Sequence, residues 1–187
     1  MNGQFWWYVT RATGLVAWGL LGLSTATGLL LSARRTVGRR PAWFVDLHRG
    51  MSGLGCLFVA AHLVAILADS FANFGLLDVF VPMRTSLSPG AVAWGIVALY
   101  LLVAVEATSL ALRQVPYRLW RRVHYAGLAI FWLTTLHALL AGTDGTNRAL
   151  LVAGTLSIVG CACLLVRRVA ERTALAGSGL KPLYDRM

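Results

Sequence analysis

Long apolar runs, separated by short basic or polar segments, dominate this chain. Five of the runs are long enough for membrane-spanning helices, which need about 20 residues each. They cover residues 5–31, 43–68, 91–112, 117–141 and 147–166. Residues 70–90 are broken by Gly and Pro, so they predict an outer loop on the membrane with room for one helical turn. The pattern predicts an all-α polytopic membrane bundle of five transmembrane helices over 1–172, followed by a short cytoplasmic tail over 173–187.

Composition supports a membrane protein and excludes a soluble one. Of the 187 residues, 58% are apolar and 13% are charged, whereas soluble domains average about 45–50% apolar and about 25% charged. Five spans leave no room for a large soluble catalytic domain. In a membrane protein, basic residues set the orientation in the bilayer and bind anionic lipid. We attribute the net charge of +10 to these two roles. We therefore expect contact with membrane lipid and no nucleic-acid partner.

The basic residues alternate between the two sides of the predicted bundle. Thirteen of the 17 lie on one side: Arg34, Arg35, Arg39, Arg40, Arg113, Arg118, Arg121, Arg122, Arg167, Arg168, Arg172, Lys181 and Arg186. The opposite side carries Arg11, Arg84 and Arg148. Cytoplasmic loops are enriched in Lys and Arg, which predicts a multi-pass plasma-membrane protein with its N-terminus outside and its C-terminus in the cytoplasm.

All four histidines lie in two of the predicted spans. His48 and His62 are 14 residues apart in the second span, and His124 and His137 are 13 apart in the fourth. At about 1.5 Å per residue, each of these spans has one histidine toward each membrane face. The two spans run parallel, so His48 and His124 are predicted at an inner depth, and His62 and His137 at an outer depth. Ionisable groups inside a membrane are costly and usually functional.

Two facing histidines at one depth can supply both axial ligands of a haem iron. Zinc and copper sites gather three or four ligands, and no Cys, Met or carboxylate recurs at either depth. We therefore predict two haems, with metal ligands His48, His124, His62 and His137, and no catalytic side chain. The alternative is a non-redox helix bundle in which the histidines are packing residues.

An ideal fourth helix would not direct both of its histidines at one partner helix. At about 100° per residue, His62 lies about 40° from His48, but His137 lies about 140° from His124. The pairing therefore requires a kink, a π-bulge or a tilt in this span, and Gly127 is the position that we expect to provide it.

Neighbouring residues supply candidate contacts to the haems. Arg49, Arg121 and Arg122 flank the inner pair, and Arg11 lies at the depth of the outer pair; each can bind a propionate or simply reflect the positive-inside rule. Gly53 is one of four small residues, with Gly50, Ser52 and Gly55, that allow close approach of a macrocycle or of another helix. Glu106, an acid inside the third span, is expected to pair with an arginine or to relay a proton.

The two histidine segments resemble the ferric-reductase-like transmembrane domain, a family that includes ferric reductases, NADPH oxidases and the haem subunit of methionine sulfoxide reductase. They read V-D-L-H-R-G-M-S-G-L-G-C-L-F-V-A-A-H and W-R-R-V-H-Y-A-G-L-A-I-F-W-L-T-T-L-H. A-G-T-D at 141–144 adds to the similarity, which covers about residues 40–145 and is greatest to short actinobacterial members. The resemblance implies an inner b-type haem on His48 and His124 and an outer one on His62 and His137.

Larger members of this family carry a C-terminal flavin and nicotinamide domain, and many have six spans. This chain ends shortly after the fifth predicted span and has no G-x-G-x-x-G motif. The resemblance therefore implies an electron-transfer subunit, with a separate cytoplasmic flavin reductase as donor and an extracytoplasmic redox partner or small molecule as acceptor. The alternative is a quinol-linked cytochrome b subunit of a larger oxidoreductase complex.

Overall fold

The structure is a computed structural model that describes residues 3–33, 42–70, 72–141 and 147–177. These residues form helices and no strand, which confirms the all-α prediction. The helices are α1 (Gly3–Ala33), α2 (Ala42–Ala68), α3 (Leu76–Phe80), α4 (Pro89–Leu110), α5 (Tyr117–His124), α6 (Ala126–Ala141) and α7 (Arg148–Gly177).

Four segments among the described residues are long and apolar enough to cross a membrane. They are Gln4–Ser32, Ala42–Ala68, Pro89–Leu110 and Tyr117–Ala141, the last of which joins α5 and α6. The apolar part of α7, Leu151–Arg167, is shorter. The first four predicted spans therefore have matching helices. The fifth has a helix at the predicted place, but its described apolar stretch does not reach the same length.

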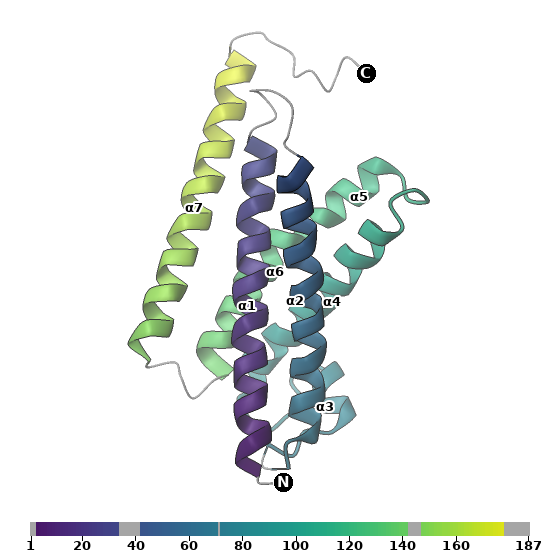
Figure 1. The fold of residues 1–187 in the computed structure, drawn as a ribbon, viewed down its shortest axis with the longest axis vertical. Helices are drawn as coiled ribbons and strands as arrows, with labels where there is room; N and C mark the ends of the chain where they lie inside the picture. Colours follow the sequence, from purple (N-terminus) through teal and green to yellow (C-terminus); the bar gives the residue numbers. More distant parts are fainter. Residues whose placement is uncertain (1–2, 34–41, 71, 142–146, 178–187) are drawn as a thin grey trace.

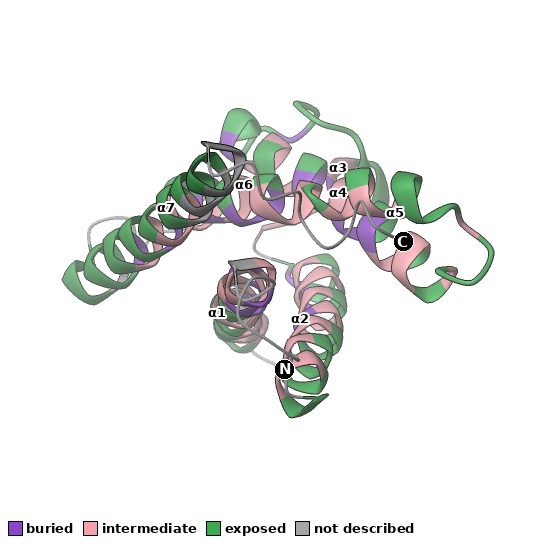
Figure 2. Cartoon of the chain, turned by 90° about the horizontal axis from the view of Figure 1, so that it is seen from above, coloured by how far each residue is buried: buried purple, intermediate pink, exposed green. Residues whose placement is uncertain are grey.

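The helices pack in pairs. α1 lies along α2, α4 lies along α6, and α7 lies against α1; Figure 2 shows α1 and α2 side by side, with α4, α6 and α7 in a row across from them. One buried cluster joins α1, α4 and α6: Leu21, Leu102, Val105 and Ile130. A second joins α1, α6 and α7: Leu29, Phe131 and Cys161. Many outward-facing side chains are also large and apolar, as expected for helices that face lipid.

Successive spans run in opposite directions, with α5 and α6 forming one span, so α2 and α6 point the same way along the long axis (Figure 1). α1 begins at one end of that axis and α7 ends at the other (Figure 1). This direction places the first histidines of α2 and of the α5–α6 segment toward one end, as the parallel arrangement predicted.

The predicted irregularity of the fourth span is present, but not at Gly127. The helix breaks at Tyr125, directly after His124, where the Tyr125 N–H approaches the carbonyls of Arg121, Arg122 and Val123 together. Such crowding of i−2 to i−4 carbonyls marks a tightened turn between two helical segments. The break frees His124 from the angular register of α6, which removes the conflict that a straight helix would create.

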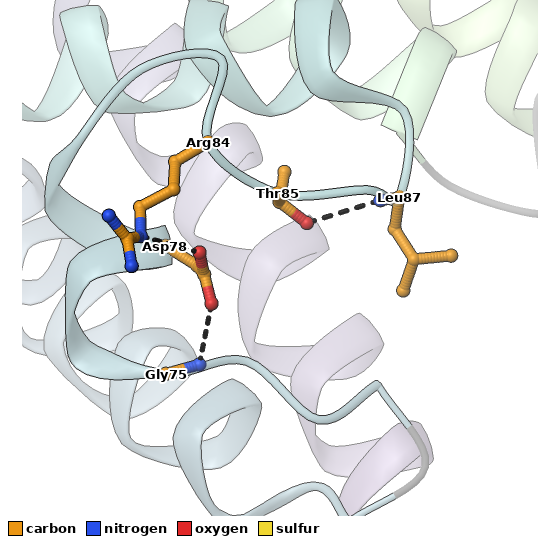
Figure 3. Close-up of polar contacts among 5 residues, drawn as sticks. All are labelled: Gly75, Asp78, Arg84, Thr85 and Leu87. Carbon is orange, nitrogen blue, oxygen red and sulfur yellow. Dashed lines mark hydrogen bonds and ion pairs between the residues drawn. The ribbon is translucent and has the colours of Figure 1, made fainter.

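The described residues between α2 and α4 form a loop that contains one short helix, α3. Figure 3 shows its polar contacts: the Gly75 N–H donates to Asp78 Oδ2 over 2.9 Å, and Arg84 Nε lies 3.4 Å from Asp78 Oδ1. The Leu87 N–H donates to Thr85 Oγ1 over 3.2 Å, and the Tyr100 hydroxyl donates to the Phe80 carbonyl. The predicted helical turn is present as α3, and the place of this loop on the outer membrane surface stays a prediction.

Several sequence-based predictions concern residues that the structure does not describe. They include the basic loop Arg34, Arg35, Arg39 and Arg40, the G-T-D part of the motif at 142–144, and the tail from 178 onward with Lys181 and Arg186. The described part of the predicted tail is helical, because α7 continues past residue 173 to Gly177.

Candidate functional site

The four histidines form two facing pairs between α2 and the α5–α6 segment. The ring centroids of His48 and His124 are 6.0 Å apart, with an interplanar angle of 74°. Those of His62 and His137 are 6.3 Å apart, at 81°. The structure therefore brings together the same partners that the depth argument predicted.

The separation within each pair is compatible with two imidazoles that share one metal ion. An imidazole nitrogen lies about 2.0–2.1 Å from a metal that it ligates and roughly 1.1 Å from its own ring centroid, so two rings on opposite sides of an ion have centroids about 6.3 Å apart. The observed 6.0 and 6.3 Å match this value. Edge-to-face packing of two rings also occurs at centroid separations of about 4.5–7 Å, so the spacing fits a shared metal ion and the packing alternative alike.

Three of the four histidines have the Nδ1 atom at a backbone carbonyl of a neighbouring helix. His48 Nδ1 lies 2.9 Å from the carbonyl oxygen of Ser24, and His62 Nδ1 lies 2.8 Å from the carbonyl oxygen of Thr10. Both of these carbonyls belong to α1. His137 Nδ1 lies 2.9 Å from the Ala91 carbonyl oxygen in α4. A carbonyl only accepts, so Nδ1 carries the proton and Nε2 keeps its lone pair for a metal. Metal-binding histidines usually donate their other ring N–H to a carbonyl or a carboxylate in this way, which fixes the orientation of the ring.

His124 is supported differently. Its Nδ1 atom is buried and has no hydrogen-bond partner among the described residues. Its ring instead stacks on Trp120, with centroids 4.8 Å apart and planes 26° apart. The Trp120 Nε1–H donates to Ser109 Oγ in α4 over 3.2 Å. Sequence reasoning missed Trp120, although its place four residues before His124 puts the two rings on one helix face.

The predicted arginines lie at the expected levels, but their contact with a propionate stays a prediction. Arg11 follows Thr10, whose carbonyl meets His62, and its guanidinium lies 4.1 Å from the centroid of Trp7. Arg121 donates to the hydroxyls of Tyr125 and Tyr117, over 2.9 and 3.2 Å. Arg49 and Arg122 are exposed.

The small residues of α2 fall into two groups. A Cβ atom on Gly55 would lie 2.9 Å from Leu21 Cδ2, so Gly55 allows α1 and α2 to pack closely. A Cβ atom on Gly50 or Gly53 would meet nothing within 4 Å among the described residues. Close helix packing therefore explains Gly55, and Gly53 remains available to a bound group.

Glu106 contacts a serine, whereas an arginine was the expected partner. The Ser52 hydroxyl of α2 donates to Glu106 Oε1 of α4. Because α2 packs mainly along α1, this bond is a separate polar link between α2 and α4, which the histidine pairs do not join.

The donor set suits a haem better than a bare metal ion. The described residues contain no group of three or more His, Cys, Asp or Glu side chains that could hold an ion. A haem supplies four equatorial nitrogens of its own and needs two axial ligands, which each pair provides. Both pairs fit that requirement through their separation and, for three of the four rings, through the Nε2 lone pair that the Nδ1–carbonyl contact leaves free.

A family model, described as the ferric reductase like transmembrane component, matches residues 13–136. The match begins in α1 and ends one residue before His137, so it covers most of the bundle and three of the four histidines. No curated protein and no solved structure matches the chain. The family match spans more than half of the chain and agrees with the paired histidines: this membrane protein belongs to the family of ferric reductase like transmembrane components.

Proposed function

We propose that this protein is a transmembrane b-type cytochrome that carries electrons across the plasma membrane through two stacked bis-histidine haems. The observation that carries the proposal is the pairing of the four histidines at centroid separations of 6.0 and 6.3 Å. Membership in the ferric-reductase-like family supports a transmembrane electron-transfer role. When bound, a haem supplies one-electron chemistry that no side chain of this bundle offers.

The residues of the chain have three tasks in this proposal. The histidines bind the iron through Nε2, while the carbonyls of Thr10, Ser24 and Ala91 orient three of the rings. Arg11 at the outer level, and Arg49, Arg121 and Arg122 at the inner level, neutralise the propionates. The apolar helices exclude water from the site, which would favour electron transfer over reaction with small ligands.

The donor is a separate cytoplasmic flavoprotein, and the acceptor is a redox protein or a small molecule outside. Arg113, Arg118 and Arg122 are exposed at the end of the bundle that carries the inner pair. A basic surface attracts an acidic partner and speeds its association. The same charges contact anionic lipid at the cytoplasmic leaflet.

Five spans, with the N-terminus outside, complete the proposal. α7 contains 30 residues, and at about 1.5 Å per residue it is longer than a hydrocarbon core about 30 Å thick. Its apolar part, Leu151–Arg167, meets the lower limit of about 17 residues for a membrane helix. The opposite positions of the start of α1 and the end of α7 (Figure 1) agree with an odd number of passes.

Reporter fusions test this topology. We expect a periplasmic-type reporter to be active at the N-terminus and a cytoplasmic reporter to be active at the C-terminus, because 13 of the 17 basic residues lie on alternate connections. A third fusion, in the outer loop after Arg84, should behave like the N-terminal fusion. Both termini on the cytoplasmic side would contradict five spans.

Donor preference separates the two kinds of electron-transfer subunit. We expect flavin reductase with NAD(P)H to reduce the purified protein at least tenfold faster than a quinol does, and the rate to fall with added salt because the contact is electrostatic. Arg118→Gln should slow this reaction, whereas Arg84→Gln, on the other side, serves as the matched control. Faster reduction by quinol, with no effect of Arg118→Gln, would identify a quinol-linked cytochrome b subunit instead.

A further inference from the structure

Each histidine with a carbonyl partner also lies against a glycine, and the glycine is always four residues after that carbonyl. A Cβ atom on Gly14, four residues after Thr10, would lie 2.9 Å from His62 Nδ1. A Cβ atom on Gly95, four residues after Ala91, would lie 2.8 Å from His137 Nδ1. On Gly28, four residues after Ser24, it would lie 3.2 Å from His48 Cε1.

The spacing of four has a geometric reason. In an α-helix the carbonyl of residue i accepts the N–H of residue i+4, so the carbonyl and the glycine occupy the same ridge, one turn apart. A carbonyl oxygen has a second lone pair, which remains for the imidazole. The ring can reach that oxygen only if its edge passes over the i+4 position, and non-bonded heavy atoms prefer about 3.5–4.0 Å. A Cβ atom at that position would lie 2.8–3.2 Å from the ring in the three cases, so a side chain there would displace the ring.

The arrangement recurs as a repeat in the sequence of α1. Residues 10–14 read T-R-A-T-G and residues 24–28 read S-T-A-T-G, with a period of 14. His48 and His62 in the antiparallel helix α2 have the same period. Equal periods on two packed helices keep both contacts in register, because both positions turn by the same angle about their axes. In α4, A-V-A-W-G at 91–95 has the same Ala-x-Gly ending.

The fourth histidine lacks this arrangement, and the chain shows why. Fourteen residues after Ala91 and Gly95, α4 carries Val105 and Ser109. The Ser109 hydroxyl donates to the Val105 carbonyl over 2.7 Å and accepts the Trp120 Nε1–H. Trp120 then stacks on His124. A serine–tryptophan support therefore takes the position where a fourth glycine would lie, next to the helix break at Tyr125.

We propose that Gly14, Gly28 and Gly95 are positioning residues for the haem ligands. Each glycine and the carbonyl four residues before it form one glycine seat: Thr10–Gly14 for His62, Ser24–Gly28 for His48, and Ala91–Gly95 for His137. The seat holds the Nδ1 edge of the imidazole and thereby fixes the plane of the ring and the direction of Nε2. This proposal rests on the proposed function, because it assigns the seated rings to haem iron.

Alanine substitutions in the full-length purified protein test the seats. Gly14→Ala and Gly95→Ala should each lose at least half of the outer haem, and the haem that remains should give an altered low-spin EPR signal, since the anisotropy depends on the angle between the two ring planes. Gly28→Ala should alter the inner signal with less loss, because its Cβ contact is longer. Gly19→Ala in α1 and Gly90→Ala in α4, where a Cβ atom meets nothing within 4 Å among the described residues, should match the wild type.

Alanine is a better helix former than glycine, so helix propensity alone would make each Gly→Ala variant more stable. A loss of haem in these variants therefore reports the clash between the new Cβ atom and the imidazole ring. Two haems per chain and unchanged EPR signals in Gly14→Ala, Gly95→Ala and Gly28→Ala would overturn the proposal. Equal losses in the Gly19→Ala and Gly90→Ala controls would overturn it as well.

A double-mutant cycle separates the seats from the proposed function, because it does not need haem. Gly14→Ala should lower the thermal unfolding temperature by several degrees in the wild-type background and by none in a His62→Ala background, where the ring is absent. If Gly14→Ala yields no folded protein, the His62→Ala/Gly14→Ala double variant should restore it. Equal shifts of the unfolding temperature in the two backgrounds would overturn the glycine seats, and so would failure of both Gly14→Ala and the double variant to fold. A wild-type protein that binds no haem would overturn the proposed function alone.

Discussion

His62→Ala and His137→Ala are expected to lose the outer haem and keep the inner one, and His48→Ala and His124→Ala are expected to do the reverse. Each substitution would remove one of the two histidines that hold that haem, and the partner histidine alone would not retain it. The two variants of one pair should therefore share one spectrum, and the total haem should fall to about half. Haem content and reduced-minus-oxidised spectra of the four purified variants measure this.

Thr25→Ala is the matched control for a polar side chain lost inside the bundle, because the Thr25 hydroxyl donates to the Leu21 carbonyl of its own helix. It should retain both haems. If His48→Ala instead matched His137→Ala, the pairs would be crossed. That result would contradict both the parallel direction of α2 and α6 and the 6.0 and 6.3 Å pairs.

The same variants should differ in what a cytoplasmic-side donor can reduce. In vesicles with the α5 side facing a flavoprotein donor, His48→Ala and His124→Ala should show no fast reduction. His62→Ala and His137→Ala should show about half of the wild-type absorbance change and should pass no electrons to an acceptor on the far side. The expectation follows because the two pairs are separated by 14 residues along α2 and by 13 along the α5–α6 segment.

Fast reduction of the inner-pair variants by the same donor would mean that the outer pair is the entry point. The proposed direction of electron flow would then be wrong, although the pairing itself would stand. The Thr25→Ala control should reproduce the wild-type amplitude and rate in these vesicles.

The sequence was sufficient to predict the helices and the partners within each histidine pair. Separations of 14 and 13 residues on two parallel helices leave one way to match depths, so His48 meets His124 and His62 meets His137. The position of the helix break could not be predicted from the sequence. Gly127 was the natural expectation from helix propensity, but the chain breaks at Tyr125, next to a His124 ring held by Trp120 and Ser109. That tertiary contact is not visible in a local pattern.

The partners of the histidines could not be predicted from residue types, because every residue carries a backbone carbonyl. Ser24, Thr10 and Ala91 share no side-chain chemistry. Their one common signal is the glycine four residues later, and in α1 this signal is the 14-residue repeat ending at Gly14 and Gly28. This repeat is not a recognisable signal in the sequence of α1 alone. It gains a meaning only from His48 and His62, which have the same period in α2, the helix that packs against α1.

Glu106 illustrates the same limit. An acid inside a membrane predicts a partner, and an arginine was the expected one because this chain has so many. The partner in the structure is Ser52, which lies one helical turn after His48 and faces α4 from α2. Only the packing of the two helices decides which polar group of α2 reaches the carboxyl.

The haem content of the purified wild-type protein tests the central claim most directly. A pyridine haemochrome assay, with protein concentration from amino-acid analysis, should give two b-type haems per chain. The oxidised protein should show two low-spin EPR signals and no high-spin iron, because each iron has two histidine ligands. No bound haem, or haem that is high-spin and retained when His62 and His48 are both replaced by alanine, would contradict the account.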